Sequence, residues 1–177
     1  PLIIGEDVER TVKHADLTNP KIHQLPAKMA LHRQLPYVKG TVLWYAKAAV
    51  DNVGNYGTSL RNVYWKYPAL QPAMPFIDDK APKKVKKLKP MWIDNDYVLF
   101  WTTPKSKSWD DEIVKYVVYR FAKGEKININ DPSKIMTITN VPFYKLPYKN
   151  GKEKWTYVVT ALDRLQNESK IAKKNIK

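Results

Sequence analysis

The sequence contains no cysteine. Disulfide bonds and cysteine-ligated metal sites are therefore excluded, although an extracytoplasmic location stays open. The sequence also lacks any apolar run of about 18 residues, so it predicts no membrane-spanning helix. The opening residues, Pro1 to Ile4, do not form a signal peptide. They begin an apolar segment directly, and we expect the chain to be a piece of a longer protein.

Glycine and histidine are scarce as well. The 6 glycines are scattered and form no phosphate-binding loop. The 3 histidines, His14, His23 and His32, recur at a spacing that fits neither one helix face nor a metal-binding motif. No combination of Ser, His and Asp suggests a catalytic triad. The sequence therefore predicts no metal, no cofactor and no catalytic residue within the chain.

Arginine is the rare basic residue. The chain has 31 Lys and Arg against 17 Asp and Glu, a net charge of +14, and only five of the basic residues are Arg. Residues 1–80 hold 10 basic and 7 acidic residues, so residues 81–177 hold the remaining 21 and 10. A positive field of this kind favours polyanions. Because Arg dominates base and phosphate readout, we expect a solvated lysine-rich surface and no nucleic-acid partner.

The N-terminal part alternates between strand and helix patterns. Apolar residues 2–4 predict a buried strand, and residues 41–46 predict a second strand covered on both faces. Between these two strands, Asn19 followed by Pro20 predicts the start of a helix. After the second strand, residues 58–67 predict another helix, capped by Thr58. Strands joined by helices pair in parallel, so this part reads as a βαβα segment.

Prolines then mark a connection. Five of them fall within residues 68–90, together with the basic run 83–89. A basic run of this kind can bind polyanions. The competing interpretation is that Val85 and Leu88 pack an edge strand whose lysines protect it from pairing with another strand. The expected organisation is a first domain over residues 1–76, a connection with the first edge strand over 77–90, and a second domain over 91–177.

The C-terminal part has a period of two. Trp101 falls on one alternating segment, Tyr116 and Val118 fall on the next, and residues 135–138 form a shorter one. Residues 155–161 alternate again, residues 163–167 supply a polar turn, and residues 168–176 return as a final strand. Six or seven short strands with turn-like spacing predict an all-β sandwich. The whole chain is therefore α+β.

The strand segments YVLFW, KYVVYRF and WTYVVTALDRLQNES resemble a fibronectin type III domain over roughly residues 82–177. The resemblance rests on Trp101, Tyr116, Val118 and the Ala161-x-Asp163 end of the penultimate strand. It implies an immunoglobulin-like sandwich. The corner tyrosine of that family falls on either Trp155 or Tyr157.

The preceding residues resemble the glycosyl-hydrolase-like 10 family. The matching motifs are Gly40 to Ala46, Asn52, Leu60-Arg61 and the proline-rich stretch from Pro68 to Pro75. These are secreted or lipid-anchored bacterial proteins with a glycosidase-type (β/α)8 barrel followed by a fibronectin-like domain. The resemblance implies that residues 1–76 are the incomplete C-terminal end of such a TIM barrel, with residues 2–4 and 41–46 as its seventh and eighth strands.

Candidate substrate-binding residues follow from this arrangement, because barrel sites lie at the carboxyl ends of strands. They are Glu6, Asp7, Trp44, Tyr45, Lys47, Asn52, Asn55 and Tyr56. Carboxylates could contact sugar hydroxyls, and aromatic rings could stack on a sugar. The competing interpretation makes the acids ordinary loop or helix-start residues, and makes Trp44 and Tyr45 part of the core.

The expected function is that of a non-catalytic C-terminal fragment of a secreted glycoside hydrolase, with the sandwich as a structural or accessory module. Its partners would be the rest of the barrel and, through the intact parent, a polysaccharide or oligosaccharide. The expected location is secreted, periplasmic or lipid-anchored at the cell surface. The alternative is a binding module for carbohydrate, through exposed aromatics, or for polyanions, through the lysine-rich surface.

Overall fold

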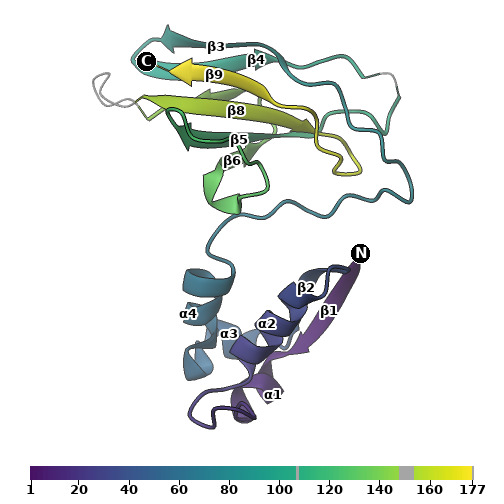
Figure 1. Cartoon of the computed structure of the whole chain (residues 1–177), viewed down its shortest axis with the longest axis vertical. Helices are drawn as coiled ribbons and strands as arrows, with labels where there is room; N and C mark the ends of the chain where they lie inside the picture. The colour runs from purple at the N-terminus through teal and green to yellow at the C-terminus, as the bar shows by residue number, and fades with distance from the viewer. Residues whose placement is uncertain (107, 148–153, 177) are drawn as a thin grey trace. The chain divides into compact units, whose positions relative to one another are not determined.

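The structure is a computed structural model that describes residues 1–106, 108–147 and 154–176. It divides into two compact units, Pro1–Lys66 and Tyr67–Lys177 (Figure 1). The division falls ahead of residue 76, because the connecting segment belongs to the second unit. Leu70 packs on the outer face of a sheet there, and the Met74 N–H donates to the Leu165 carbonyl at 3.1 Å.

The first unit contains one parallel strand pair. Strand β1 (Leu2–Asp7) pairs with β2 (Val38–Trp44) in parallel, which confirms the predicted pairing. Between them run helices α1 (Val8–Lys13) and α2 (Leu25–Gln34). After β2 come α3 (Lys47–Val50), the 3₁₀ turn η1 (Val53–Asn55), α4 (Tyr56–Ser59) and the π-helical turn η2 (Leu60–Tyr64).

The predicted helix start at Asn19 and Pro20 is wrong. Helix α2 begins at Leu25, with Pro26 in its first turn, where a missing backbone N–H costs nothing. Asn19 instead lies in a turn, and its N–H donates to the Asp16 carboxylate at 3.0 Å. Local side-chain bonding of this kind competes with helix formation.

The second strand also differs from the prediction. It begins at Val38, contains Gly40 and ends at Trp44. A Cβ at Gly40 would lie 2.9 Å from the Ile3 side chain, so glycine lets the two strands approach. The expectation that both faces are covered is wrong, because Val42 is 59% and Trp44 73% exposed.

Helices cover the other face of this strand pair. The buried cluster there consists of Val8, Leu25, Met29, Ala48, Tyr56 and Leu60. Thr58 does not cap a helix, since α4 already begins at Tyr56. Within the residues expected to form that helix, Leu60 is buried whereas Val63 is exposed.

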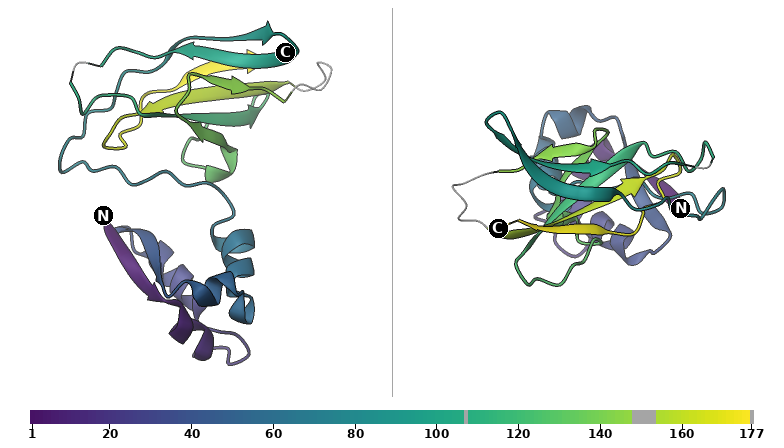
Figure 2. Two further views of the ribbon diagram at one scale, coloured as in Figure 1. Left: turned by 180° about the vertical axis from the view of Figure 1, so that it is seen from behind. Right: turned by 90° about the horizontal axis from the view of Figure 1, so that it is seen from above.

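The second unit is the predicted β sandwich. Its strands are β3 (Lys86–Ile93), β4 (Asp96–Thr102), β5 (Lys115–Ala122), β6 (Ile135–Thr139), β7 (Phe143–Lys145), β8 (Trp155–Leu162) and β9 (Ala172–Ile176), with the 3₁₀ turn η3 (Pro132–Lys134) before β6. They form two antiparallel sheets, β3-β4-β7 and β6-β5-β8-β9, which face each other (Figures 1 and 2). This is a fibronectin- or immunoglobulin-like arrangement.

Both faces of the four-stranded sheet are covered. On its inner face, Tyr116, Val118 and Tyr157 pack against the other sheet, which contributes Trp101 of β4. On the outer face, Tyr119, Phe121 and Val158 are fully buried. Their cover is supplied by Leu70, Ile127 and Ile129, from outside the strands.

Strand β3 lies at an edge of the sandwich, as the sequence predicted. Val85 is 2% exposed, and both Val85 and Leu88 pack into the core between the sheets. The lysines between and beside them are exposed. The edge-strand interpretation of the basic run is therefore confirmed for its apolar residues.

Candidate functional site

The candidate site lies at the carboxyl edge of the parallel strands. Glu6 is in register with Leu43, and Asp7 is in register with Trp44. Partners in a parallel pair share a face, while successive residues alternate between faces. Because Leu43 packs into the helix-covered core, Glu6 points to the helix side. Asp7 and Trp44 belong to the uncovered face.

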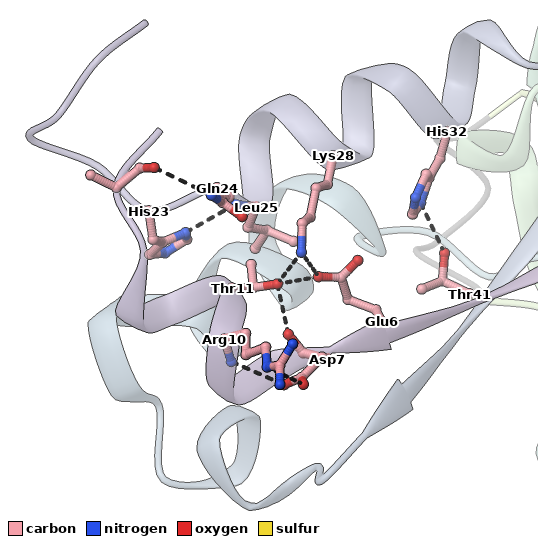
Figure 3. Close-up of polar contacts among 11 residues, drawn as sticks. Glu6, Asp7, Arg10, Thr11, His23, Gln24, Leu25, Lys28, His32 and Thr41 are labelled. Atoms are coloured by element: carbon pink, nitrogen blue, oxygen red, sulfur yellow. Dashed lines mark hydrogen bonds and ion pairs between the residues drawn. The ribbon is translucent and has the colours of Figure 1, made fainter. Parts of the chain in front are cut away.

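Glu6 belongs to a compact polar cluster with Thr11 of α1 and Lys28 of α2 (Figure 3). The Lys28 ammonium lies 2.7 Å from the Glu6 carboxylate and donates to the Thr11 hydroxyl at 2.6 Å. The Thr11 hydroxyl itself contacts the Glu6 carboxylate and the Asp7 carbonyl. Glu6 is only 3% exposed, so its charge is compensated within the unit and is turned away from the uncovered face.

Asp7 ends β1 and caps α1. Its carboxylate accepts the Arg10 N–H at 2.9 Å, and the Arg10 guanidinium lies 3.5 Å from its other oxygen. The Asp7 side chain stays partly accessible. It therefore has both a structural role as a helix cap and an accessible edge on the face that it shares with Trp44.

Trp44 and Tyr45 are both accessible. Trp44 is 73% exposed, and Tyr45 is 56% exposed directly after β2 ends. Tyr45 has a positive φ of 55°, which is unfavourable for a residue with a Cβ and a bulky ring. The core-packing interpretation of these two aromatics is wrong, since both rings are more exposed than buried.

Lys47 and Asn52 shape the loop that follows. Lys47 pairs with Asp51 one helical turn later, and this hydrogen bond raises the pKa of Lys47. Asn52 adopts a positive φ of 56°, and its side-chain oxygen accepts the Thr58 N–H at 2.8 Å. Both candidate residues are therefore bound to their own segment, and their roles here are local.

Asn55 lines a cleft of about 570 Å³ between the α1–α2 loop and η1. His14, His23 and Gly54 also border this cleft. The His23 ring lies 2.9 Å from the Gly54 carbonyl, which ties the two walls together. Two lysines, Lys13 and Lys21, also border this cleft.

Tyr56 does not line a surface, because it is fully buried in the helical core. Its hydroxyl has no hydrogen-bond partner among the described residues. Burial raises the pKa of Tyr56 well above its usual range, and the nearby charge of Glu6 adds to the rise. The phenol therefore stays neutral beside the Glu6–Lys28 pair.

The structure brings Asp7, Trp44 and Tyr45 together at one edge and separates Glu6 and Tyr56 from them. Sequence reasoning missed Thr11, Lys28 and His23. The parity of β1 could have placed Glu6 and Asp7 on opposite faces, but no local signal linked Glu6 to Lys28. In the parts of the chain that the structure describes, no group of three or more His, Asp or Glu side chains could hold a metal ion. No helix among those residues is long and apolar enough to span a membrane.

Comparison with known proteins finds one curated relative, glycosyl hydrolase YngK of Bacillus subtilis (strain 168). It is 34% identical over 150 residues, which are 85% of this chain and 29% of the relative. The chain is thus similar to a glycosyl hydrolase, and it spans less than a third of that protein's length. No family model matches the sequence.

Solved structures resemble a portion of the chain. FN3tt mut covers 54% of this chain and 94% of its own, with 15% identity and a TM-score of 0.41. The spore cortex lytic enzyme SleM of Clostridium perfringens covers 54% and 28%, with 16% identity and a TM-score of 0.38. Both TM-scores lie below 0.5. The sandwich is identified by the order and pairing of its strands.

Proposed function

We propose that this chain belongs to a glycoside hydrolase in which residues 1–66 form one wall of a sugar-binding cleft and the sandwich serves as a structural or accessory module. The observation that carries this proposal is the exposed Trp44 ring, which shares the uncovered sheet face with Asp7. An exposed indole offers a flat apolar surface for a sugar ring, and a carboxylate beside it accepts hydroxyl hydrogen bonds. The similarity to a glycosyl hydrolase supports the choice of substrate class.

The uncovered face also supports a larger parent structure. Ile3, Val42 and Trp44 expose apolar surface there. Parallel sheets are stable when both faces are covered and several strands pair. We propose that further strand–helix units complete this sheet as a (β/α) barrel, which would turn Ile3 and Val42 toward the barrel interior and leave Trp44 and Asp7 at its carboxyl-end opening.

The chain by itself should not hydrolyse glycosides. That reaction uses two carboxyl groups about 5–10 Å apart on either side of the scissile bond. The three acids at or soon after the ends of β1 and β2 are paired with other groups: Glu6 with Lys28, Asp7 with Arg10 and Asp51 with Lys47. We propose that catalytic carboxylates come from elsewhere in the parent. Release of reducing sugar by the purified chain at an enzymatic rate would overturn this part of the proposal.

Sugar binding can be tested at Trp44. Titration of the chain with soluble neutral hexasaccharides of glucose, xylose and N-acetylglucosamine should give weak binding to at least one of them. Trp44→Ala should lower that affinity about tenfold, equivalent to about 1.4 kcal/mol. Trp109, which is 70% exposed on the sandwich, provides the control, and Trp109→Ala should bind like the wild type. Equal losses in both variants, or none in either, would contradict the role of Trp44.

The parent is proposed to act outside the cytoplasm, where polymeric glycans are accessible. Antibody detection of the protein in culture medium or on intact cells tests this location. Recovery of the protein in the cytosolic fraction alone would contradict it.

A further inference from the structure

Two edge strands of the sandwich, together with the residues just before each of them, carry a strip of lysines. Strand β3 is the edge of the three-stranded sheet, β9 is the edge of the four-stranded sheet, and the two strands lie close together (Figure 1). The members of this lysine strip are all exposed: Lys84, Lys86, Lys87, Lys89, Lys170, Lys173 and Lys174. Their charges therefore gather around the edge that β3 and β9 form.

The lysine strip has no acidic partner in the described part of the chain. Within residues 1–106, 108–147 and 154–176, no acidic side chain forms an ion pair with any of the seven. Elsewhere on the sandwich, Lys134 pairs with Glu125 and Lys145 pairs with Asp96. Two sandwich lysines outside the strip are thus compensated, whereas the seven inside it have no acidic partner among the described residues and are open to an external anion.

Protection of the edges accounts for only part of this pattern. A few charges next to a free edge suffice to block pairing with another strand. Register places Lys86 and Lys89 opposite Thr102 and Phe100, on the outer face of the three-stranded sheet. Lys173 is in register with Val158, on the outer face of the four-stranded sheet. The lysine strip therefore extends around the edge, over both outer faces.

We propose that the lysine strip binds an anionic polysaccharide, one that carries carboxylate or phosphate groups along its chain. An extended polymer lying along the strands would meet an ammonium group every few residues, at about 3.3 Å per residue. Lysine binds such groups as a point charge, without fixed geometry, which suits a repeating polyanion. Only the choice of a glycan as the polyanion rests on the proposed function.

The composition of the lysine strip argues against nucleic acid. It contains no arginine, so it cannot make the planar two-bond contacts that read phosphates and bases. Binding should be electrostatic and should weaken steeply with salt.

The test uses the full chain with polygalacturonate as the carboxylate probe, a glycerol-phosphate wall polymer as the phosphate probe and dextran as the neutral control. Affinity is measured between about 20 and 200 mM salt. Lys86→Gln, Lys89→Gln and Lys174→Gln are combined in one variant. The matched control combines Lys21→Gln, Lys39→Gln and Lys126→Gln, three exposed lysines outside the strip. Circular dichroism checks that both variants fold.

The strip variant should bind at least one anionic polymer about tenfold more weakly and lose about three units of the log–log salt slope. The control variant should keep most of the affinity. Binding of polygalacturonate would indicate recognition of carboxylates, and binding of the glycerol-phosphate polymer would indicate recognition of phosphates. No binding at low salt, equal losses in the two variants, or equally tight binding of single-stranded DNA of matched charge would each overturn the proposal. Because Trp44 is untouched, these results do not depend on the hexasaccharide experiment.

Discussion

In the 1–66 unit, helices cover one face of a two-stranded sheet and the other face is exposed, whereas both faces of the four-stranded sheet in the 67–177 unit are covered. The contrast is clear in single residues. Val42 on the first sheet is 59% exposed, while Val118 and Val158, on opposite faces of the second sheet, are 0% exposed. Burial of apolar surface is the main stabilising contribution to folding. The sandwich can therefore fold with the apolar surface that it buries itself, whereas one face of the sheet in the 1–66 unit stays uncovered.

The two units also use charge differently. The first unit buries an ion pair, Glu6 with Lys28, inside its helical layer. The sandwich keeps its ion pairs at the surface, as between Lys145 and Asp96. Removing one partner of a buried ion pair leaves an uncompensated buried charge and is strongly destabilising, whereas a surface ion pair contributes little to folding stability. Electrostatic substitutions should therefore act more strongly in the first unit.

The largest expected effect is a difference in local stability. Native-state hydrogen exchange on the full chain should show amides of β1 and β2 opening with a free energy lower by about 3 kcal/mol or more than those of β5 and β8, because the opening energy follows buried apolar contact. Residues 67–177 alone should retain the protection of β5 and β8. Equal protection in the two units would remove the contrast between them.

A smaller effect is expected from breaking the buried pair. Lys28→Ala leaves the Glu6 carboxylate buried without its cation, and should lower the opening free energy of β1 and α2 by about 2–3 kcal/mol, less than for a fully buried pair because Lys28 is partly exposed. Lys13→Ala, which breaks the surface pair with Glu9, is the control and should cost about 0.5 kcal/mol or less. Adding Glu6→Gln to Lys28→Ala should restore part of the loss. Similar costs for Lys28→Ala and Lys13→Ala would show that Glu6 is solvated.

The smallest effect concerns carboxylate titration, for which each unit offers a case. The Lys134 hydrogen bond holds the pKa of Glu125 below its usual value, and bonds from Thr18 do the same for the pKa of Asp16. A lowered folded-state pKa contributes stability above the unfolded-state pKa, and this contribution is lost as pH falls through the folded-state pKa. NMR titration of Lys134→Ala should show the Glu125 midpoint rising, with Asp16 unchanged. Thr18→Ala should raise the Asp16 midpoint and leave the Glu125 midpoint unchanged. A shift of both midpoints in either variant would contradict these local causes.

The sandwich was largely predictable because its signals are local. Alternation in residues 155–161 places Tyr157, Val159 and Ala161 on one face, and all three are buried there. The predicted turn at 163–167 forms because the Asp163 carboxylate accepts the Leu165 and Asn167 N–H groups. A period of two and a turn former act within a few residues, so sequence alone can reveal them.

The candidate site was predictable only in part. Trp44 and Asp7 were expected close to the carboxyl ends of their strands, and they are the last residues of β2 and β1. The parallel pairing that sets them in register followed from the strand–helix alternation. Tyr56 was expected near the surface and is buried, because α4 begins at Tyr56 and packs it into the helical core. Its environment depends on helices α1 and α2, which the residues around it do not specify.

The sequence by itself determined that a strand–helix segment precedes an antiparallel sandwich, because hydrophobic periodicity and proline placement are patterns of residues that are neighbours in the chain. Only the tertiary structure decided the partners and the exposure of the charged and aromatic side chains. It turned Glu6 toward Lys28, 22 residues away, and left Trp44 exposed. It also brought the lysines of β3 and β9 together from segments far apart in the chain. Such pairings depend on which surfaces meet after folding, and that is a property of packing rather than of local pattern.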